Sequence, residues 1–208
     1  IQSFFGKELN SISKSQIEKL IKIRRNCFEP LNRKNLYNYI KDEYKLRGKL
    51  SSKDLISKKV DSWLYEQDIS FKKNIAQQKN WVIAFLQPSH SYWATEEERQ
   101  QKVLGMYLCS RDWDLSNGEK MIYTLCVDPD YRGLGVGKKL INHAIRYCRE
   151  SGNNLNLLVE KFNKRAVKLY QSLGFEIIEP AKIPDDSMLL YGRYFMRYVP
   201  SKGEKSIR

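Results

Sequence analysis

The sequence predicts one mixed α/β (α+β) domain, in which a helical first part is followed by a sheet with further helices. Three observations favour this fold class. The chain has 208 residues, 41% of them hydrophobic, which is enough for a sizeable core. Helical periodicity dominates the basic region 1–80, whereas strand-sized apolar runs mark residues 81–199. No Pro/Gly/Ser-rich linker or internal repeat precedes the tail at 200–208, so we expect a single domain over residues 1–208.

Three helices are expected in the first 80 residues. Ser15 can cap the first, and Pro30 is expected to end it, because proline cannot continue a helical hydrogen-bond ladder. A weaker apolar pattern follows and ends near Gly48. The third helix is expected to begin at Ser51, which has an acidic residue three positions on, as in a capping box. Residues 69–80 are ambiguous.

The next part of the chain predicts an antiparallel meander. Residues 81–86 form a short apolar run, typical of a buried strand. A long polar loop is expected at 88–102, and a second strand at 103–110. The Asn-Gly pair at 117–118 is a strong hairpin signal that joins this strand to a third at 120–127.

Helices and strands alternate in the last part. Residues 137–150 carry an apolar helical face, and residues 155–159 are almost continuously apolar, as in a central parallel strand. Asn163 can cap another helix, which Gly174 is expected to end. The last two strands are expected at 175–178 and 188–199.

The positive charge is unevenly distributed. The formal net charge is +13, and residues 1–80 alone carry 18 Lys and Arg against 9 Asp and Glu. Such an excess can attract nucleic acid, an acidic membrane or an anionic ligand, or it can simply form a solvated surface. The sequence lacks the alternation of aromatic and basic residues typical of nucleic-acid modules, so nucleic acid is the less favoured partner.

The cysteines predict reduced thiols in the core. They form no C-x-x-C pair, and the two histidines complete no zinc-ligand spacing, so no metal is expected. Residues 1–5 lack the features of a secretory signal, and no apolar run approaches the roughly 20 residues of a membrane helix. We therefore expect a cytoplasmic location and no membrane span. The four cysteines are Cys27, Cys109, Cys126 and Cys148.

The most informative segment is residues 127–139, where a strand ends, three alternate glycines follow and a helix begins. Glycines allow the backbone N–H groups to approach a ligand, and a helix start favours an anion such as phosphate. The spacing G-x-G-x-G does not match a Rossmann loop. Arg132 and Lys139 stand where a P-loop needs Gly and Ser/Thr. A purely structural turn stays open as the alternative.

Two motifs carry a resemblance to a known family. Arg132, Gly135 and Gly137 fit R-x-x-G-x-G, and residues 125–145 resemble the acetyl-CoA-binding motif of the GCN5-related N-acetyltransferases (GNAT). The second motif, L-x-V-x-x-x-N-x-x-A-x-x-L-Y-x-x-x-G-F, lies about 30 residues further on. All of its fixed positions are filled, by Leu157, Val159, Asn163, Ala166, Leu169, Tyr170, Gly174 and Phe175.

The resemblance implies the GNAT-like acyl-CoA N-acyltransferase fold. This is a mixed, mostly antiparallel sheet of about seven strands with flanking helices, splayed between the fourth and fifth strands. The first strand would lie near residues 1–5. The chain departs from the family in the long region before Trp81 and in the long loop at 88–102, and acceptor contacts are expected in either departure.

The resemblance also implies an enzyme that transfers an acetyl group from acetyl-CoA, as co-substrate, to an amine of a small molecule, peptide or protein by direct attack. By this resemblance, the backbone of three strand residues would pair with the pantetheine arm: Leu125, Cys126 and Val127. The glycine loop would bind the pyrophosphate through Arg132, Gly133, Leu134, Gly135, Val136, Gly137 and Lys138. Asn163 would contact the CoA arm, and Tyr170 would protonate the leaving thiolate.

Each of these roles has a structural alternative. Asn163 could serve only as a helix cap, Tyr170 only as a core aromatic, and Lys138 only as an exposed helix residue. Cys126 as an acyl-enzyme nucleophile is less favoured, because no histidine neighbours it in sequence.

The general base is not identified by any motif. Some family members carry a glutamate where this chain has Leu158. The remaining candidates nearby in sequence are Glu160, Asp128, Glu119 and Tyr123, and a water chain or a distant carboxylate stays open as an alternative.

Two other functions compete with catalysis. The same fold could sense CoA without turnover, or residues 1–80 could bind nucleic acid. No motif identifies the acceptor amine or the oligomeric state.

Overall fold

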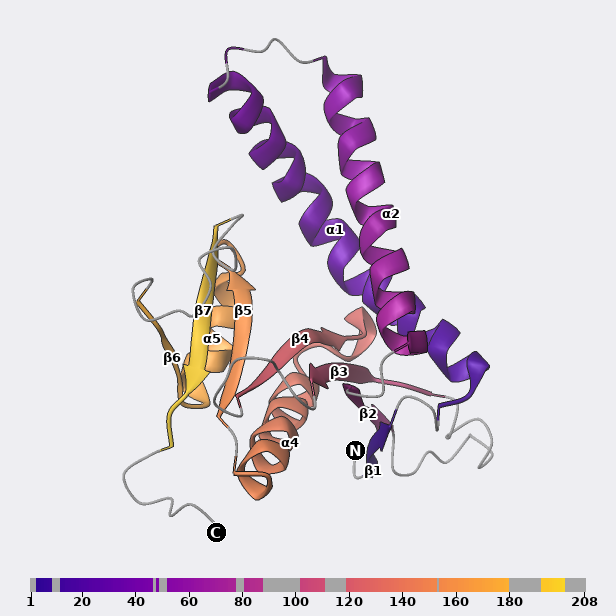
Figure 1. The fold of residues 1–208 in the computed structure, drawn as a ribbon, viewed down its shortest axis with the longest axis vertical. Coiled ribbons are helices and arrows are strands. Elements are labelled where there is room, and N and C mark those ends of the chain that lie inside the picture. The colour runs from indigo at the N-terminus through magenta and orange to yellow at the C-terminus, as the bar shows by residue number, and fades with distance from the viewer. Residues whose placement is uncertain are drawn as a thin grey trace.

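The computed structural model contains a seven-stranded sheet in the order β1-β2-β3-β4-β5-β7-β6, with helices on both faces (Figure 1). The strands are β1 (Ser3–Glu8), β2 (Trp81–Gln87), β3 (Gly105–Ser110), β4 (Lys120–Val127), β5 (Leu155–Glu160), β6 (Phe175–Ile177) and β7 (Arg193–Tyr198). The helices are α1 (Lys14–Leu46), α2 (Lys53–Gln77), α4 (Val136–Glu150), α5 (Lys164–Ser172) and the short 3-10 helix η2 (Pro129–Tyr131). The structure describes residues 3–8, 12–46, 48, 52–77, 81–87, 102–110, 119–152, 154–179 and 192–200.

The strand pairing confirms the predicted meander and the splayed sheet. Strands β1 to β4 pair antiparallel in sequence order, and β7 pairs antiparallel with both β5 and β6. Strands β4 and β5 pair parallel only from Lys120 opposite Leu155 to Ile122 opposite Leu157. Beyond that point the two strands diverge, as Figure 1 shows. The first strand begins at Ser3, so it lies two residues later than expected and ends at Glu8.

A β-bulge in β4 marks the point of divergence. Leu108 lies opposite Thr124, but the next residue of β3 lies opposite Ile122, so Tyr123 is the extra residue of β4. Bulges bend a strand and increase its twist. Because pairing with β5 ends at Ile122, the bulge bends β4 away from β5 just before the glycine loop.

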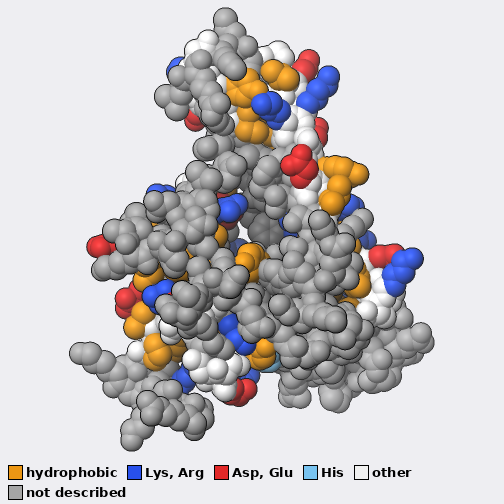
Figure 2. Space-filling view, in the orientation of Figure 1, with side chains coloured by type: hydrophobic (Ala, Val, Ile, Leu, Met, Phe, Trp, Pro, Cys, Tyr) orange, Lys and Arg blue, Asp and Glu red, His pale blue; other side chains and the backbone are white. Residues whose placement is uncertain are grey.

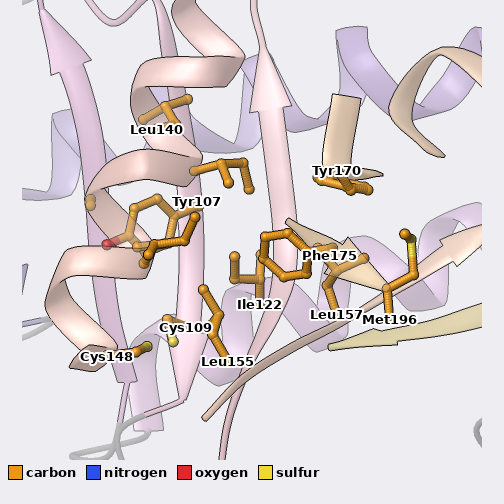
Figure 3. Close-up of a cluster of buried hydrophobic side chains, with 14 of the residues drawn as sticks. Tyr107, Cys109, Ile122, Leu140, Cys148, Leu155, Leu157, Tyr170, Phe175 and Met196 are labelled. Carbon is orange, nitrogen blue, oxygen red and sulfur yellow. The ribbon is translucent and has the colours of Figure 1, made fainter. Parts of the chain in front are cut away.

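Two apolar cores lie on the two faces of the sheet. The larger packs α4 and α5 against the sheet, and Leu140, Ile141 and Ala144 of α4 are fully buried in it (Figure 3). The second packs α1 and α2 against the opposite face through Leu20 of α1 and Phe71 of α2. The sheet is therefore a middle layer, with α4 and α5 on one face and α1 and α2 on the other.

Helices α1 and α2 form a long antiparallel arm that extends past the sheet (Figure 1). The expectation that Pro30 ends the first helix was wrong, because α1 is one helix of 33 residues that continues through it. A proline removes one backbone hydrogen bond, but here α2 packs along α1 and the helix is held by tertiary contacts as well. The cap is Ser13 rather than Ser15: Ser13 Oγ accepts from the Gln16 N–H, and Gln16 Oε1 accepts from the Ser13 N–H.

Helix α2 begins at Lys53, and the Leu55 N–H donates to Ser52 Oγ at 3.2 Å. It runs to Gln77, so most of the ambiguous stretch 69–80 is helical. The predicted cap Ser51, most of the loop at 88–102, the Asn-Gly turn at 117–118 and the start of the last strand at 188–191 lie outside the described residues.

All four cysteines are free and buried, as the sequence predicted. No helix within the described ranges is long and apolar enough to cross a bilayer. Among the same residues, no three His, Cys, Asp or Glu side chains gather as a metal site would require.

Candidate active site

A cavity of about 310 Å³ lies in the fork of the sheet. Its walls are the end of β4, the glycine loop with the start of α4, the end of β5 with the start of α5, and one residue of α1. The fork opens here because the bulge has bent β4 away from β5. The lining residues are Cys27, Leu125, Val127, Tyr131, Arg132, Gly133, Gly135, Val136, Gly137, Lys138, Glu160, Phe162, Asn163, Arg165, Ala166 and Leu169.

The glycine loop has the backbone geometry of an anion site. Gly133 and Gly135 adopt φ values of 84° and 77°, a region that favours glycine. Gly135 is the N-cap of α4, and its carbonyl accepts the Lys139 N–H at 3.0 Å. The N–H groups of the first-turn residues before Lys139 have no hydrogen-bond partner within the helix. The helix dipole also makes this end of α4 partly positive. A negatively charged ligand group fits there.

Gly137 keeps the loop close to the opposite wall. A Cβ atom built on it would meet Leu169 Cδ2 at 3.4 Å and Val127 Cγ2 at 3.6 Å. These are ordinary van der Waals distances, so the protein itself tolerates a methyl group here. The methyl group would instead take up space inside the cavity that Leu169 and Val127 line.

Basic side chains surround this end of the cavity. Arg132 and Lys138 line it and are exposed, and Arg132 Nε donates to the Val127 carbonyl at 3.4 Å. Arg165 contributes a third positive charge from the start of α5. In Figure 2, blue Lys and Arg side chains lie on both the body and the arm, and red acidic side chains accompany them on both. The cavity therefore has its own concentration of positive charge.

The β5 side of the cavity carries one amide and one carboxylate. Asn163 caps α5, with its Oδ1 accepting the Ala166 N–H at 3.2 Å, as the sequence predicted. Glu160 Oε1 lies 3.6 Å from Arg193 Nε of β7. Of the four candidate bases, Glu160 is the one whose side chain belongs to the cavity wall.

The other candidate bases are engaged elsewhere. Glu119 is buried at the opposite end of β4, where its carboxylate accepts from Arg197 at 2.6 Å and from Asn156 at 3.1 Å. Asp128 Oδ1 caps the short helix η2 by accepting the Asp130 N–H. Tyr123 lies on the bulge and is 47% exposed.

Three of the predicted site residues do not line the cavity. Cys126 points to the α1 face and is 1% exposed, and Leu134 is 61% exposed. Tyr170 is 7% exposed and packs against Phe175, with ring centroids 5.8 Å apart (Figure 3). Burial raises the pKa of Tyr170 above its usual value, and the Coulombic effects of Cys126 and Glu160 act in the same direction. Its neighbour in the chain, Leu169, does line the cavity.

Cys27 belongs to the cavity but was not predicted. It lies 100 residues before Val127, whose carbonyl accepts its S–H at 2.7 Å. The sequence places Cys27 on the apolar face of a helix, and nothing in that pattern shows that α1 crosses the end of β4. Only the three-dimensional packing of α1 on the sheet brings this thiol to the glycine loop.

Comparison with known families gives a clear assignment. The model of the acetyltransferase (GNAT) family matches residues 53–175, which is more than half of the chain. The chain belongs to the GNAT family. The seven-stranded order, the fork between β4 and β5 and the glycine loop at the start of α4 are thus the features of a GNAT fold.

Curated relatives resemble part of the chain. An N-acetyltransferase of Methanocaldococcus jannaschii is 42% identical over 86 residues, which are 39% of this chain and 38% of that protein. N-alpha-acetyltransferase 50 of Danio rerio is 35% identical, over 46% of this chain and 55% of that protein. Peptidyl-lysine N-acetyltransferase YjaB of Escherichia coli (strain K12) is 33% identical, over 50% and 61%. The chain thus spans about two fifths to three fifths of these relatives' lengths.

Solved structures share the fold over almost the whole chain. The PaiA N-acetyltransferase from Thermoplasma acidophilum, in complex with coenzyme A, has a TM-score of 0.56 and 14% identity, covering 96% of this chain and 100% of that one. A GNAT-family acetyltransferase from Staphylococcus aureus Mu50 has a TM-score of 0.57 and 18% identity, covering 94% and 98%. At these identities the likeness concerns the fold alone.

Proposed function

We propose that this GNAT protein is an N-acetyltransferase that moves an acetyl group from acetyl-CoA to an amine by direct attack. The single observation that carries the proposal is the cavity in the fork, which joins an anion site at α4 to the open edge of β4. A thioester is already activated, so the protein needs to hold the donor, polarise its carbonyl and protonate the departing sulfur.

We assign the donor contacts to the following groups. The backbone N–H groups from Arg132 to Lys138, including Gly133, Leu134, Gly135, Val136 and Gly137, bind the pyrophosphate. Pairing between β4 and β5 ends at Ile122, so β4 has an open edge beyond that point. There the backbone of Leu125, Cys126 and Val127 can pair with the pantetheine arm, which takes the place of an additional strand. The Val127 N–H is the donor to the thioester oxygen.

Two side chains complete this assignment. Asn163 uses its Oδ1 as a helix cap, which leaves the Nδ2 amide as its donor to the CoA arm. Tyr170 is the general acid toward the sulfur. Its role does not require titration near neutral pH, because its raised pKa keeps the phenol protonated and able to donate.

The acceptor belongs to the class of peptide or protein amines in this proposal. Two of the relatives are an N-alpha-acetyltransferase and a peptidyl-lysine N-acetyltransferase by name. We also propose that the arm and the body belong to a single domain over residues 1–208, and the second core that α1 and α2 share with the sheet supports this.

Release of free thiol tests the activity. Purified protein is mixed with acetyl-CoA and a panel of peptides with a free α-amino group, peptides with an internal lysine, and small amines. Thiol release that depends on one acceptor class, with the acetyl group found on that acceptor by mass, is the expected result.

Two results would contradict the proposal. Calorimetry that detects no heat from millimolar CoA on folded protein would remove the donor site. Binding of CoA without transfer to any amine would instead indicate a CoA sensor. A separate outcome, sequence-selective binding to DNA that persists at about 200 mM salt, would favour a nucleic-acid function of residues 1–80, which does not exclude acetyl transfer.

A further inference from the structure

A pair of cysteines lies in the wall of the cavity. Cys27 of α1 lines the cavity and packs in the second core together with Cys126 of β4. The S–H of Cys27 donates to the carbonyl of Val127, the residue after Cys126. The two thiols thus come from segments almost 100 residues apart in sequence and meet at one point.

The surroundings of Cys27 favour its thiolate. The neighbouring Cys126 thiol and the Arg132 guanidinium lower the pKa of Cys27 to about 7, although burial acts in the opposite direction. Burial raises the pKa of Cys126. One thiol of the pair is therefore the nucleophile and the other is a proton-bearing partner, as in dithiols that exchange with disulfides.

Other charged groups also surround the pair. Arg24 of α1 lies near Cys126, and its positive charge lowers the pKa of Cys126 against the larger effect of burial. Lys138 and Arg165 line the same cavity as Cys27, and Glu160 is the one carboxylate among the lining residues. The cavity is thus mainly positive, which stabilises a thiolate.

A second cysteine pair provides an internal comparison. Cys109 of β3 and Cys148 of α4 also pack together, and Figure 3 shows them within the larger core. Both are at most 1% exposed, neither lines the cavity, and the pKa of Cys109 is raised well above its usual value. The two thiols of this second pair are close together, as in the first pair. They differ in that no molecule can reach them from the cavity and that the thiolate of Cys109 is disfavoured.

We propose that Cys27 and Cys126 form a redox-active dithiol in the cavity wall that is oxidised by small-molecule disulfides. The Cys27 thiolate attacks one sulfur of RSSR, forms the mixed disulfide Cys27–S–S–R and releases RS⁻. The Cys126 thiol then gives its proton to a released RS⁻ and attacks the Cys27 sulfur, which forms the Cys27–Cys126 disulfide and releases the second R group as a thiolate. Two protein thiols are oxidised and one disulfide is reduced to two thiols.

The first test uses 2-hydroxyethyl disulfide, which is small and uncharged, on the reduced, folded full chain. Intact mass and a peptide map of the wild type should show the loss of two hydrogen atoms and a link between the peptides that contain residues 27 and 126. Cys126→Ser should stop at a mercaptoethanol adduct on Cys27, and Cys27→Ser should show neither product. Cys148→Ser, the matched control from the buried pair, should react as the wild type does.

Several results would overturn the proposal. One is a wild-type map in which the 109–148 link forms as fast as the 27–126 link. Another is the absence of any adduct on Cys27 in Cys126→Ser. The wild-type map needs no substitution, so it decides the question even if a variant fails to fold.

The pH dependence gives an independent check. The rate of oxidation of the wild type by 2-hydroxyethyl disulfide is measured as a function of pH. Cys126→Ser is not used for this measurement, because the substitution removes the thiol whose interaction lowers the pKa of Cys27. The rise of the wild-type rate with pH should have a midpoint near 7, where the thiolate forms, rather than near the usual value of about 9. A midpoint near 9 would contradict the electrostatic argument.

A protection experiment rests on the proposed function. Bound acetyl-CoA, whose thioester sulfur cannot exchange with the disulfide as the free thiol of CoA would, should slow oxidation of Cys27 severalfold, because it fills the cavity through which the disulfide enters. If calorimetry shows acetyl-CoA binding but no protection, the cavity is not the route to Cys27 and the dithiol proposal fails. If acetyl-CoA does not bind at all, the proposed function fails, while the 27–126 link in the map still supports the dithiol.

Discussion

Tyr170 is the residue on which the proposed proton transfer depends. Replacing it by phenylalanine keeps the ring packed on Phe175 and removes only the hydroxyl group. We expect kcat for acetyl transfer to fall by about tenfold or more, because the thiolate then leaves without a proton donor. Steady-state thiol release with acetyl-CoA and the best acceptor measures this change.

The control is Tyr147→Phe on α4. Tyr147 is half-buried outside the cavity, with the Lys120 ammonium 4.5 Å from its ring centroid. Its rate should match that of the wild type. If Tyr170→Phe also keeps the wild-type rate, Tyr170 is a core aromatic and nothing more.

At Gly137, one added methyl group is expected to weaken CoA binding without destabilising the fold. In Gly137→Ala the added methyl group meets its neighbours at 3.4 Å or more and improves helix propensity, so the melting temperature should be unchanged or higher. The same methyl group obstructs the approach of the pyrophosphate to the N–H groups. We expect CoA binding to weaken by about tenfold, or ~1.4 kcal/mol, in calorimetry.

Gly105→Ala shows the opposite behaviour and serves as a comparison. Its Cβ would lie 2.7 Å from the Cys126 carbonyl oxygen and 3.0 Å from Leu140 Cδ1, so the protein should lose stability. If Gly137→Ala binds CoA as the wild type does, the glycine loop is only a structural turn.

At the level of single residues, the sequence identified the glycine loop but not Cys27. The loop could be recognised because its chemistry is contiguous: Arg132, Gly135 and Gly137 form a motif with a fixed spacing. Glu160 was one of four candidate bases, and the cavity distinguishes it from the other three. Cys27 reaches the cavity through the crossing of α1 over the end of β4. Such long-range contacts have no local pattern.

Among the elements, α1 shows how tertiary packing overrides a local signal. Pro30 interrupts the hydrogen-bond ladder of a helix that continues for 16 residues beyond it. Pro30→Ala restores one backbone donor in the helix interior, so we expect the free energy of unfolding to rise by about 1–3 kcal/mol. Denaturant unfolding followed by circular dichroism measures it.

Asn38→Ala is the matched control for this prediction, since Asn38 is exposed on the same helix. It should add only a few tenths of a kcal/mol, about the difference in helix propensity. A destabilised Pro30→Ala protein would show that the proline ring itself is needed in the arm.

The bulge in β4 is the element that the sequence could not predict. Residues 121–127 are apolar except for Thr124, so they show no regular alternation of apolar and polar residues from which a one-residue insertion could be recognised. The structure places Ile122 and Leu125 toward the same core, although they are three positions apart, because Tyr123 is the extra residue. The resemblance to the family predicted the splay, whereas the bulge gives its physical origin.

For the whole molecule, the question is which positive charges matter to an anionic donor. The chain carries a net charge of +13, and much of the excess lies in residues 1–80. Within the arm, nine Lys and Arg accompany four acidic residues in α1, and five lysines accompany four acidic residues in α2, so the arm carries mixed charges. The exposed ion pair between Arg33 and Asp61, at 2.7 Å, illustrates this mixing. We therefore assign attraction of the donor mainly to the cavity.

Salt dependence tests this assignment. The Debye length falls from about 30 Å at 0.01 M salt to about 3 Å at 1 M, so added salt removes long-range attraction first. We expect kcat/KM for acetyl-CoA to fall severalfold over this range while kcat changes little, because association and not chemistry depends on the field. Arg132→Ala and Lys138→Ala should each lower kcat/KM at low salt and flatten its salt dependence.

Lys53→Ala and Lys58→Ala are matched controls, because both side chains are exposed at the start of α2 near the tip of the arm (Figure 1). Each removes one positive charge from the molecule, as the cavity variants do, but far from the glycine loop. Their salt dependence should follow that of the wild type. If they flatten it as much as Arg132→Ala does, the field that draws in the donor belongs to the whole basic surface, and the arm takes part in donor capture.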